Sequence, residues 1–177
     1  CTEIFRMTFE ENIREWILDW VSQHNTALDA VPCPFAKQAL LDNKIIMHEL
    51  TPLPELISMP EYFKAQLENY TYHWPKGIEV VALGCDPKHI TAQELETAVE
   101  QSNTKTLLPR GYVALEDHPD APEIVAGESM NNGSWAIVLV QSKEKLDKAS
   151  AILERQGYYN NWSKENLDDI VNWRNTS

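Results

Sequence analysis

The sequence lacks the motifs of the common enzyme and membrane-protein classes. Its longest uninterrupted apolar run, 135–140, is far shorter than the roughly 20 residues that cross a bilayer as a helix. It has no glycine-rich phosphate loop, no Gly-x-Ser-x-Gly and no His-Glu-x-x-His. We therefore expect no membrane span, and nothing supports nucleotide binding or the common hydrolase schemes.

Basic side chains are also scarce. The 177 residues include 15 Lys and Arg against 27 Asp and Glu, which gives a formal net charge of −12 with neutral histidines. No segment is rich in Lys or Arg, so the sequence excludes nucleic acid and anionic membrane surfaces as expected partners. We expect a small molecule or a protein as the partner and leave the oligomeric state open.

Cysteine is also scarce: the sequence has only Cys1, Cys33 and Cys85. An odd number without the spacing of a disulfide framework predicts a reducing, cytoplasmic compartment. A start at Cys1 leaves the true N-terminus open; a mature lipoprotein begins with Cys, but no linker of small polar residues follows here. Asn-x-Ser/Thr sequences, which are glycosylation acceptors in secreted proteins, oppose a cytoplasmic location and leave their own use open. They begin at Asn69, Asn132, Asn161 and Asn175.

Hydrophobic periodicity and capping residues predict alternating helices and strands. We expect helices at 8–24, 34–42, 58–69, 91–101, 143–156 and 164–174. We expect strands at 45–50, 78–83, 112–115, 123–126 and 135–140. Helical connections favour parallel crossovers between the first and second and between the second and third strands. The Asn-Gly turn at 132–133 favours antiparallel strands at 112–115 and 135–140.

This element order predicts an α+β fold with a mixed four- or five-stranded sheet and helices packed on it. The nearest common architecture is ferredoxin-like, with an N-terminal helical pair and a C-terminal helix added. We expect a single domain over 1–177: N-terminal helices at 1–43, the sheet core at 44–157 and an aromatic C-terminal helix at 158–177.

Cys33 is the first candidate for chemistry, because it lies between two prolines at the expected start of a helix. A thiol at a helix N-cap lies beside unpaired backbone N–H groups, which lower its pKa, and Lys37 one turn later adds positive charge. Such a thiolate is a nucleophile or a metal ligand. The alternative is a small apolar side chain packed under the helix.

His118 is the second candidate, because Glu116-Asp117-His118 leaves the carboxyl end of the third strand. Open α/β sheets bind ligands at the carboxyl ends of their strands. His118 would act as a base or second ligand, with Asp117 or Glu116 orienting it. The alternative is a proline-bounded turn with solvated acids.

These two segments also carry a resemblance. Cys33-Pro34-Phe35-Ala36, followed later by His118-Pro119, resembles small uncharacterised bacterial proteins with a Cys-Pro-Phe-Ala segment after an N-terminal helix and a later His-Pro pair. The resemblance covers only these short segments and implies that they form one site. It implies no activity, because that group of proteins has none assigned.

A third candidate site and an aromatic tail complete the sequence. Cys85 and His89 have a spacing that can supply two metal ligands, which Cys33 or His118 would complete; the alternative is a buried Cys85. The tail is rich in aromatic residues, which favours either a partner surface or a second small core. Its members are Tyr158, Tyr159, Trp162 and Trp173.

The leading hypothesis is a small enzyme of unknown substrate with a thiol/histidine site at the carboxyl end of the sheet. Two alternatives stay open: a non-catalytic, acidic ligand- or protein-binding module that uses the aromatic C-terminal helix, and a Cys/His metal-binding protein. The sequence names no cofactor.

Overall fold

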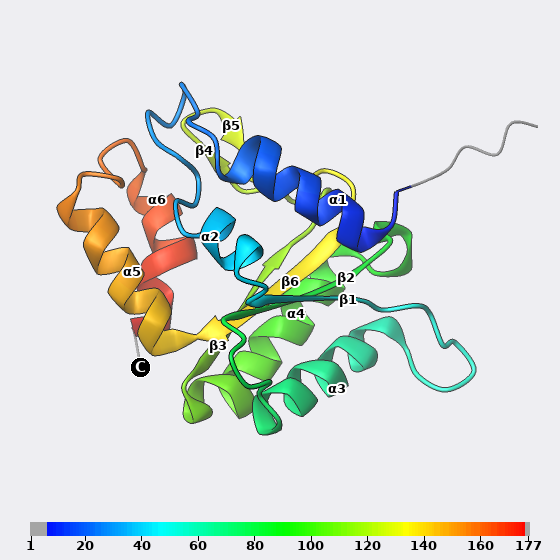
Figure 1. Ribbon diagram of the computed structural model, residues 1–177. Coiled ribbons are helices and arrows are strands. Elements are labelled where there is room, and N and C mark those ends of the chain that lie inside the picture. The colour runs from blue at the N-terminus through cyan, green and yellow to red at the C-terminus, as the bar shows by residue number, and fades with distance from the viewer. Residues whose placement is uncertain (1–6, 176–177) are drawn as a thin grey trace, which may run out of the picture.

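The central element is a four-stranded mixed sheet, seen in a computed structural model that describes residues 7–175 (Figure 1). Its strand order is β1-β2-β6-β3, with β1 parallel to β2 and β6 antiparallel to both of its neighbours. The strands are β1 (Ile45–Glu49), β2 (Val80–Cys85), β3 (Tyr112–Asp117) and β6 (Ala136–Ser142). The predicted α+β class with a mixed sheet is confirmed.

The connections run β-α-β-α-β-β, and β6 inserts between β2 and β3. A ferredoxin-like chain runs β-α-β-β-α-β, so that finer assignment is not confirmed. Because β2 and β3 both run antiparallel to β6, they point the same way as β1. The carboxyl ends of these three strands therefore lie at one end of the sheet.

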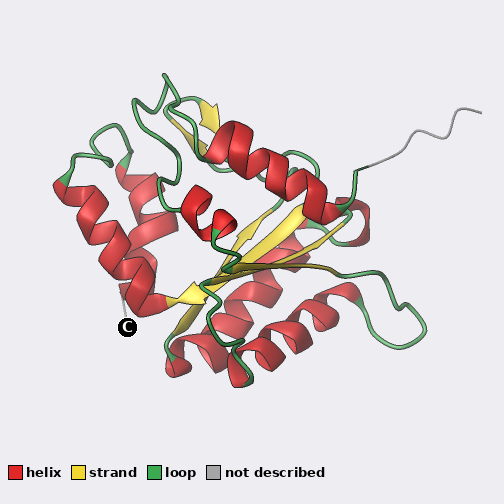
Figure 2. Cartoon of the chain, in the orientation of Figure 1, coloured by secondary structure: helices red, strands yellow, loops and turns green. Residues whose placement is uncertain are grey.

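Helices cover both faces of the sheet (Figure 2). One face carries α1 and α2, the other carries α3 and α4, and α5 and α6 lie beside the end where β6 leaves the sheet (Figure 1). The helices are α1 (Phe9–Trp16), α2 (Ala36–Leu41), α3 (Met59–Tyr72), α4 (Ala92–Ser102), α5 (Lys143–Arg155) and α6 (Lys164–Leu167). Among residues 7–175, none of them combines the length and apolar character that a membrane crossing requires.

The predicted helix starts follow side-chain caps. Thr8 and Thr91 each form a reciprocal capping box with the glutamate three residues later, and the Ser58 hydroxyl accepts from a backbone N–H. The second helix differs from the expectation. A turn occupies 34–35 and α2 begins at Ala36, so Cys33 is not its N-cap.

The core has one part on each sheet face because β2 is apolar throughout. Val81 and Leu83 pack toward α3 and α4, whereas Ala82 packs toward α1 and α2. Gly84 follows on this second face, where a Cβ atom would collide with the ring of Phe9. Because successive side chains of a strand point to opposite faces, β2 contributes to the core on both sides of the sheet.

The connection from β3 to β6 holds a small hairpin that the sequence reading gave only in part. The predicted strand at 123–126 appears as β4 (Ile124–Val125), paired with β5 (Glu128–Ser129) outside the main sheet. Ala126 and Gly127 form its turn with φ of 52° and 80°, a left-handed pair that suits a two-residue hairpin. The two strands around this connection, β3 and β6, pair antiparallel as predicted.

The C-terminal tail is helical and anchored by charge. After α6 it continues through a π-helical segment, Asp168–Asn172, and a final turn, Trp173–Asn175. Arg174 is 5% exposed and donates to the Asp147 carboxylate (2.8 Å) and the Ser150 hydroxyl (2.6 Å) of α5. These bonds hold the tail against α5.

Candidate functional site

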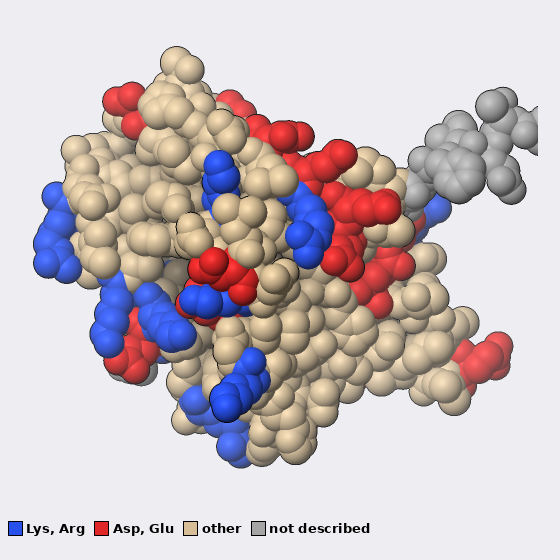
Figure 3. Space-filling model, viewed as in Figure 1, with Lys and Arg blue, Asp and Glu red and all other residues tan. Residues whose placement is uncertain are grey.

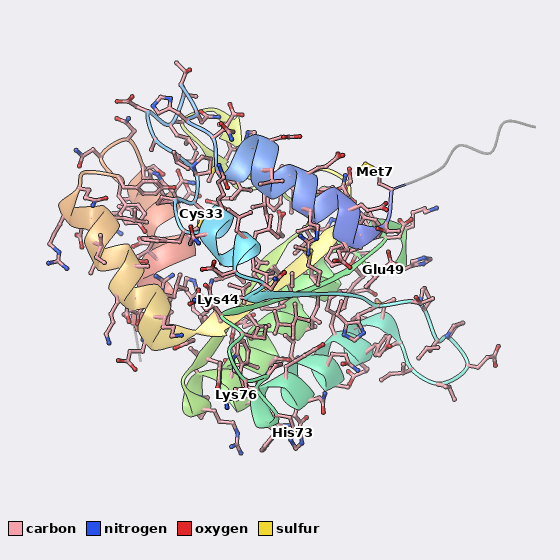
Figure 4. The ribbon with its side chains drawn as sticks, in the orientation of Figure 1. Met7, Cys33, Lys44, Glu49, His73 and Lys76 are labelled. Atoms are coloured by element: carbon pink, nitrogen blue, oxygen red, sulfur yellow. The ribbon has the colours of Figure 1, made fainter. Side chains whose placement is uncertain are left out.

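Cys33 lies on the sheet face that α1 and α2 cover, next to α2 (Figure 4). Its backbone N–H donates to the carbonyl of Val21 (2.9 Å). The carbonyl of Pro32 accepts a hydrogen bond from the Tyr158 hydroxyl. The aromatic tail therefore packs onto the Cys33 segment.

The Cys33 thiol is poorly hydrated, and burial raises its pKa. The backbone N–H groups of Phe35 and Ala36 face the sulfur and oppose this rise without reversing it. The net direction is opposite to the one expected for a thiol at a helix N-cap, because desolvation outweighs the two N–H dipoles. Lys37 lies on α2 as an exposed side chain.

His118 is 2% exposed, and both of its ring nitrogens have partners. Nδ1 accepts from the backbone N–H of Asp120 (3.1 Å), so Nε2 carries the proton and donates to the carbonyl of Ile90 (2.8 Å). The Asp120 carboxylate lies 3.9 Å from Nδ1. These bonds fix the orientation of the ring and tie the end of β3 to the loop before α4.

The structure does not bring Cys33 and His118 together. The Ile90 that accepts from His118 belongs to the core under α3 and α4. Cys33 packs in the core under α1 and α2, and the sheet lies between the two. The pairing that the short resemblance implies is therefore absent from this geometry.

Asp117 and Glu116 end β3 with side chains on opposite faces. Burial raises the pKa of Asp117 to about 6, although its carboxylate accepts from the Asn131 amide and the Asn132 backbone N–H. Burial also raises the pKa of Glu116, and the charges of nearby acids add to the rise. Those acids include Glu96 and Glu100 of α4.

Cys85 and His89 are in different environments. Cys85 is fully buried at the end of β2, and burial with the nearby Asp86 and Glu49 charges raises its pKa to about 12. His89 is exposed in the short turn that follows. Within residues 7–175, no group of three or more His, Cys, Asp or Glu side chains is placed to hold a metal ion.

The aromatic residues of the tail form a small cluster of their own. Tyr158 and Tyr159 lie edge to face at 5.0 Å, and Trp162 contacts both, at 5.9 and 5.1 Å between ring centroids. Through the Tyr158 hydroxyl this cluster reaches Pro32. The three rings are only partly buried, so the partner surface and the second small core both stay predictions.

A side chain covers the middle of the outer edge of β3. Asn103, just after α4, is 4% exposed and donates from Nδ2 to the carbonyl of Ala114 (2.9 Å). Its Oδ1 accepts from the N–H of the same residue (2.8 Å). The Asn103 amide thus pairs with the outward-facing peptide groups of Ala114, as a neighbouring strand would.

The outer edge of β1 has no such cover. The Lys44 carbonyl and the Leu50 N–H both face β2, so the even-numbered residues point inward and Ile45, Met47 and Glu49 point outward. Within the part of the chain that the structure describes, no other element hydrogen-bonds to the backbone of these three residues. Three donors and three acceptors stay available along this edge.

Exposed apolar side chains lie on either side of β1 in the chain. Leu41, before β1, is 61% exposed, and Leu53 and Leu56, after it, are 41% and 81% exposed. In Figure 3 the surface over α3 carries few charged side chains, whereas acidic side chains gather near the start of α1. An exposed apolar area on a chain of net charge −12 is typical of an interaction surface.

Two open surface depressions lie on the α3 side of the molecule. One, of about 310 Å³, is open to solvent beside Tyr72 and His73, and the other, of about 300 Å³, lies between α3 and α4. Neither is lined by Cys33 or by the acids and histidine that end β3.

Comparison of the chain with protein-family models, curated proteins and solved structures finds no match.

The sequence reading named neither Asn103 nor the β1 edge as functional. Asn103 lies just beyond the predicted end of a helix, and its hydrogen-bond partner Ala114 lies 11 residues later in the chain, on β3. For β1 the available signal was weak: a strand with a single Lys before it and no proline until Pro52. Edge strands are usually protected by such residues, so their scarcity was informative.

Proposed function

We propose that this chain is a protein-binding module that accepts an extended segment of a partner along the outer edge of β1. The observation that carries the proposal is the contrast between the two edges of one sheet. The peptide groups of Ile45, Met47 and Glu49 face outward with no hydrogen-bond partner among residues 7–175, whereas Ala114 of β3 is paired by Asn103.

Addition of a strand would extend the existing ladder. Main-chain hydrogen bonds supply affinity in this mode of recognition, and side chains that flank the edge supply specificity. Here the exposed Leu41, Leu53 and Leu56 are the flanking residues. The proposal keeps the protein-binding interpretation made from the sequence but moves the surface from the aromatic tail to β1, since Tyr158 and Arg174 hold the tail inward.

A capped peptide of residues 44–50 is the direct probe, because its sequence forms a strand in this fold. In an NMR titration we expect shifts along β1, centred on the amides of Ile45, Met47 and Glu49. A peptide with the same composition in scrambled order is the control. Shifts confined to another surface, or equal shifts with both peptides, would contradict the proposal.

Glu49→Pro and Glu49→Ala form a matched pair of variants. Proline removes an outward N–H and no inward one, whereas alanine keeps the N–H and removes only the exposed carboxylate. Loss of one hydrogen bond of about 1 kcal/mol predicts about fivefold weaker peptide binding for the proline variant. Binding by the alanine variant is expected to stay close to that of the wild type.

The thiol/histidine enzyme stays a prediction with one supporting feature, the two N–H groups that face the Cys33 sulfur. Its test is the alkylation rate of Cys33 against pH, with buried Cys85 as the internal control. A thiolate that forms well below the ordinary range would support it, whereas the raised pKa predicts slow reaction at neutral pH. The Cys85/His89 metal site and the cytoplasmic location likewise stay predictions.

A further inference from the structure

We infer that the segment accepted by β1 is the β1 strand of a second copy of this chain, paired antiparallel about a two-fold axis at Met47. The inference rests on the proposed function and names its partner. It would join two four-stranded sheets into one continuous sheet across the two copies.

Geometry restricts how β1 can pair with itself. A two-fold axis perpendicular to a sheet keeps each face on its own side, so one residue must lie opposite its own copy. Met47 is the middle of the three outward-facing residues. With Met47 opposite Met47 of the second copy, Ile45 lies opposite Glu49 at both ends, and every outward N–H and C=O group of the three residues finds a partner.

Charge favours this antiparallel arrangement. The Glu49 end of β1 lies near the start of α1, whose first turn carries Glu10 and Glu11 (Figures 3 and 4). At the other end, Lys44 lies within 4.0 Å of carboxylates of Asp42 and Glu79, and Lys76 adds positive charge (Figure 4). Antiparallel pairing therefore sets the acidic end of each copy against the balanced end of the other and keeps the two acidic ends apart.

The flanking apolar residues are arranged in the same complementary way. Leu41 precedes β1, and Leu53 and Leu56 follow it. In an antiparallel pair, the end that carries Leu53 and Leu56 in one copy meets the end that carries Leu41 in the other. The pairing would therefore bring exposed leucines of the two copies toward each other at both ends of β1.

A charge exchange at Met47 tests the two-fold axis. Met47→Lys and Met47→Glu each place like charges opposite one another in a self-pair, and an equimolar mixture places Lys opposite Glu. By sedimentation velocity we expect a wild-type dimer, self-association weakened about tenfold or more in each variant alone, and a dimer restored in the mixture. Circular dichroism establishes that both variants keep the fold.

The matched variants Glu49→Pro and Glu49→Ala give a second test of self-association that leaves the half-buried Met47 unchanged. We expect the proline variant to lose self-association and the alanine variant to keep it. A wild-type chain that stays monomeric at high concentration, or a mixture that associates no better than its components, overturns the inference. If such a monomer still binds the 44–50 peptide along β1, the proposed function stands without it; if it does not, both fail.

Discussion

The two outermost strands of the sheet differ in whether their outer backbone groups are hydrogen-bonded. β1 and β3 have similar lengths, and each pairs with one inner strand. On β3 the outward peptide groups of Ala114 meet the amide of Asn103 at 2.8 and 2.9 Å, whereas on β1 those of Met47 meet no other described element. One well-placed side-chain amide is enough to close an edge at its middle.

Charge reinforces the difference between the two edges. Glu116, on β3, lies near Glu96 and Glu100 of α4, so an incoming strand would approach a group of acids. On β1 the residues between Lys44 and Glu49 carry no Asp, Glu, Lys or Arg. Charged side chains at an edge oppose strand addition, and their absence permits it.

Proline substitutions along β1 test the direction of its peptide groups and have the largest expected effect. His48→Pro removes an inward N–H that belongs to the ladder with β2, and we expect it to destabilise the fold by about 3 kcal/mol or more in urea unfolding. Glu49→Pro removes an outward N–H and should lower stability by less than about 1 kcal/mol. His48→Ala and Glu49→Ala are the controls, and equal losses for the two prolines would show that the assigned directions are wrong.

Asn103→Ala tests the closed edge. The substitution leaves the N–H and C=O of buried Ala114 without their partner, and we expect a loss of about 2 kcal/mol in the free energy of unfolding. Thr104→Ala, at the exposed neighbouring position, is the control and should change little. If both variants unfold alike, the Asn103 amide does not close β3.

Acidic groups at the end of β3 predict a pH dependence. Burial raises the pKa of Asp117 from 3.8 to about 6, so the folded chain holds this proton more tightly than the unfolded chain. The contribution of Asp117 to stability is therefore fully present below about pH 4 and falls by about 1–2 kcal/mol as pH rises through about 6. Chemical unfolding at a series of pH values measures this slope.

Asp117→Asn should flatten that slope without abolishing it, because the pKa of Glu116 is raised in the same direction. Asp120→Asn, at an exposed position, should keep the slope. The same pH dependence of stability in the wild type and in Asp117→Asn would contradict the assignment.

Leu56→Ser has the smallest expected effect on stability and separates folding from association. Leu56 is 81% exposed, so its replacement should change the free energy of unfolding by less than about 0.5 kcal/mol. Self-association measured by sedimentation should still weaken severalfold. Leu18→Ser, at an exposed apolar residue away from β1 in the chain, is the matched control. Equal effects of the two variants on self-association would show that Leu56 is not part of the self-association surface.

Local patterns made most elements predictable. The capping boxes of Thr8 and Thr91 and the apolar run of β2 located helices and a strand close to their observed bounds. What the sequence did not yield depends on contacts between distant residues. Strand order decides that β1 lies at an edge, and packing decides that the Cys33 thiol is desolvated despite its neighbouring N–H groups.

In the candidate site, too, local features were predictable and contacts between distant residues were not. The sequence correctly predicts that His118 follows a strand. The hydrogen bonds of its ring to Ile90 and Asp120 depend on packing that the hydrophobic periodicity does not reveal. The open edge is likewise a property of the assembled sheet. Residue type suggested a thiol and a histidine, and the fold placed them on opposite faces.

Residue-resolved amide hydrogen exchange in dilute and concentrated protein tests the contrast between the edges most directly. We expect the Ala114 amide to be protected at every concentration, and those of Ile45, Met47 and Glu49 to exchange rapidly when dilute and to become protected on concentration. Protection of the β1 amides in dilute, monomeric protein, or rapid exchange at Ala114, would contradict the account.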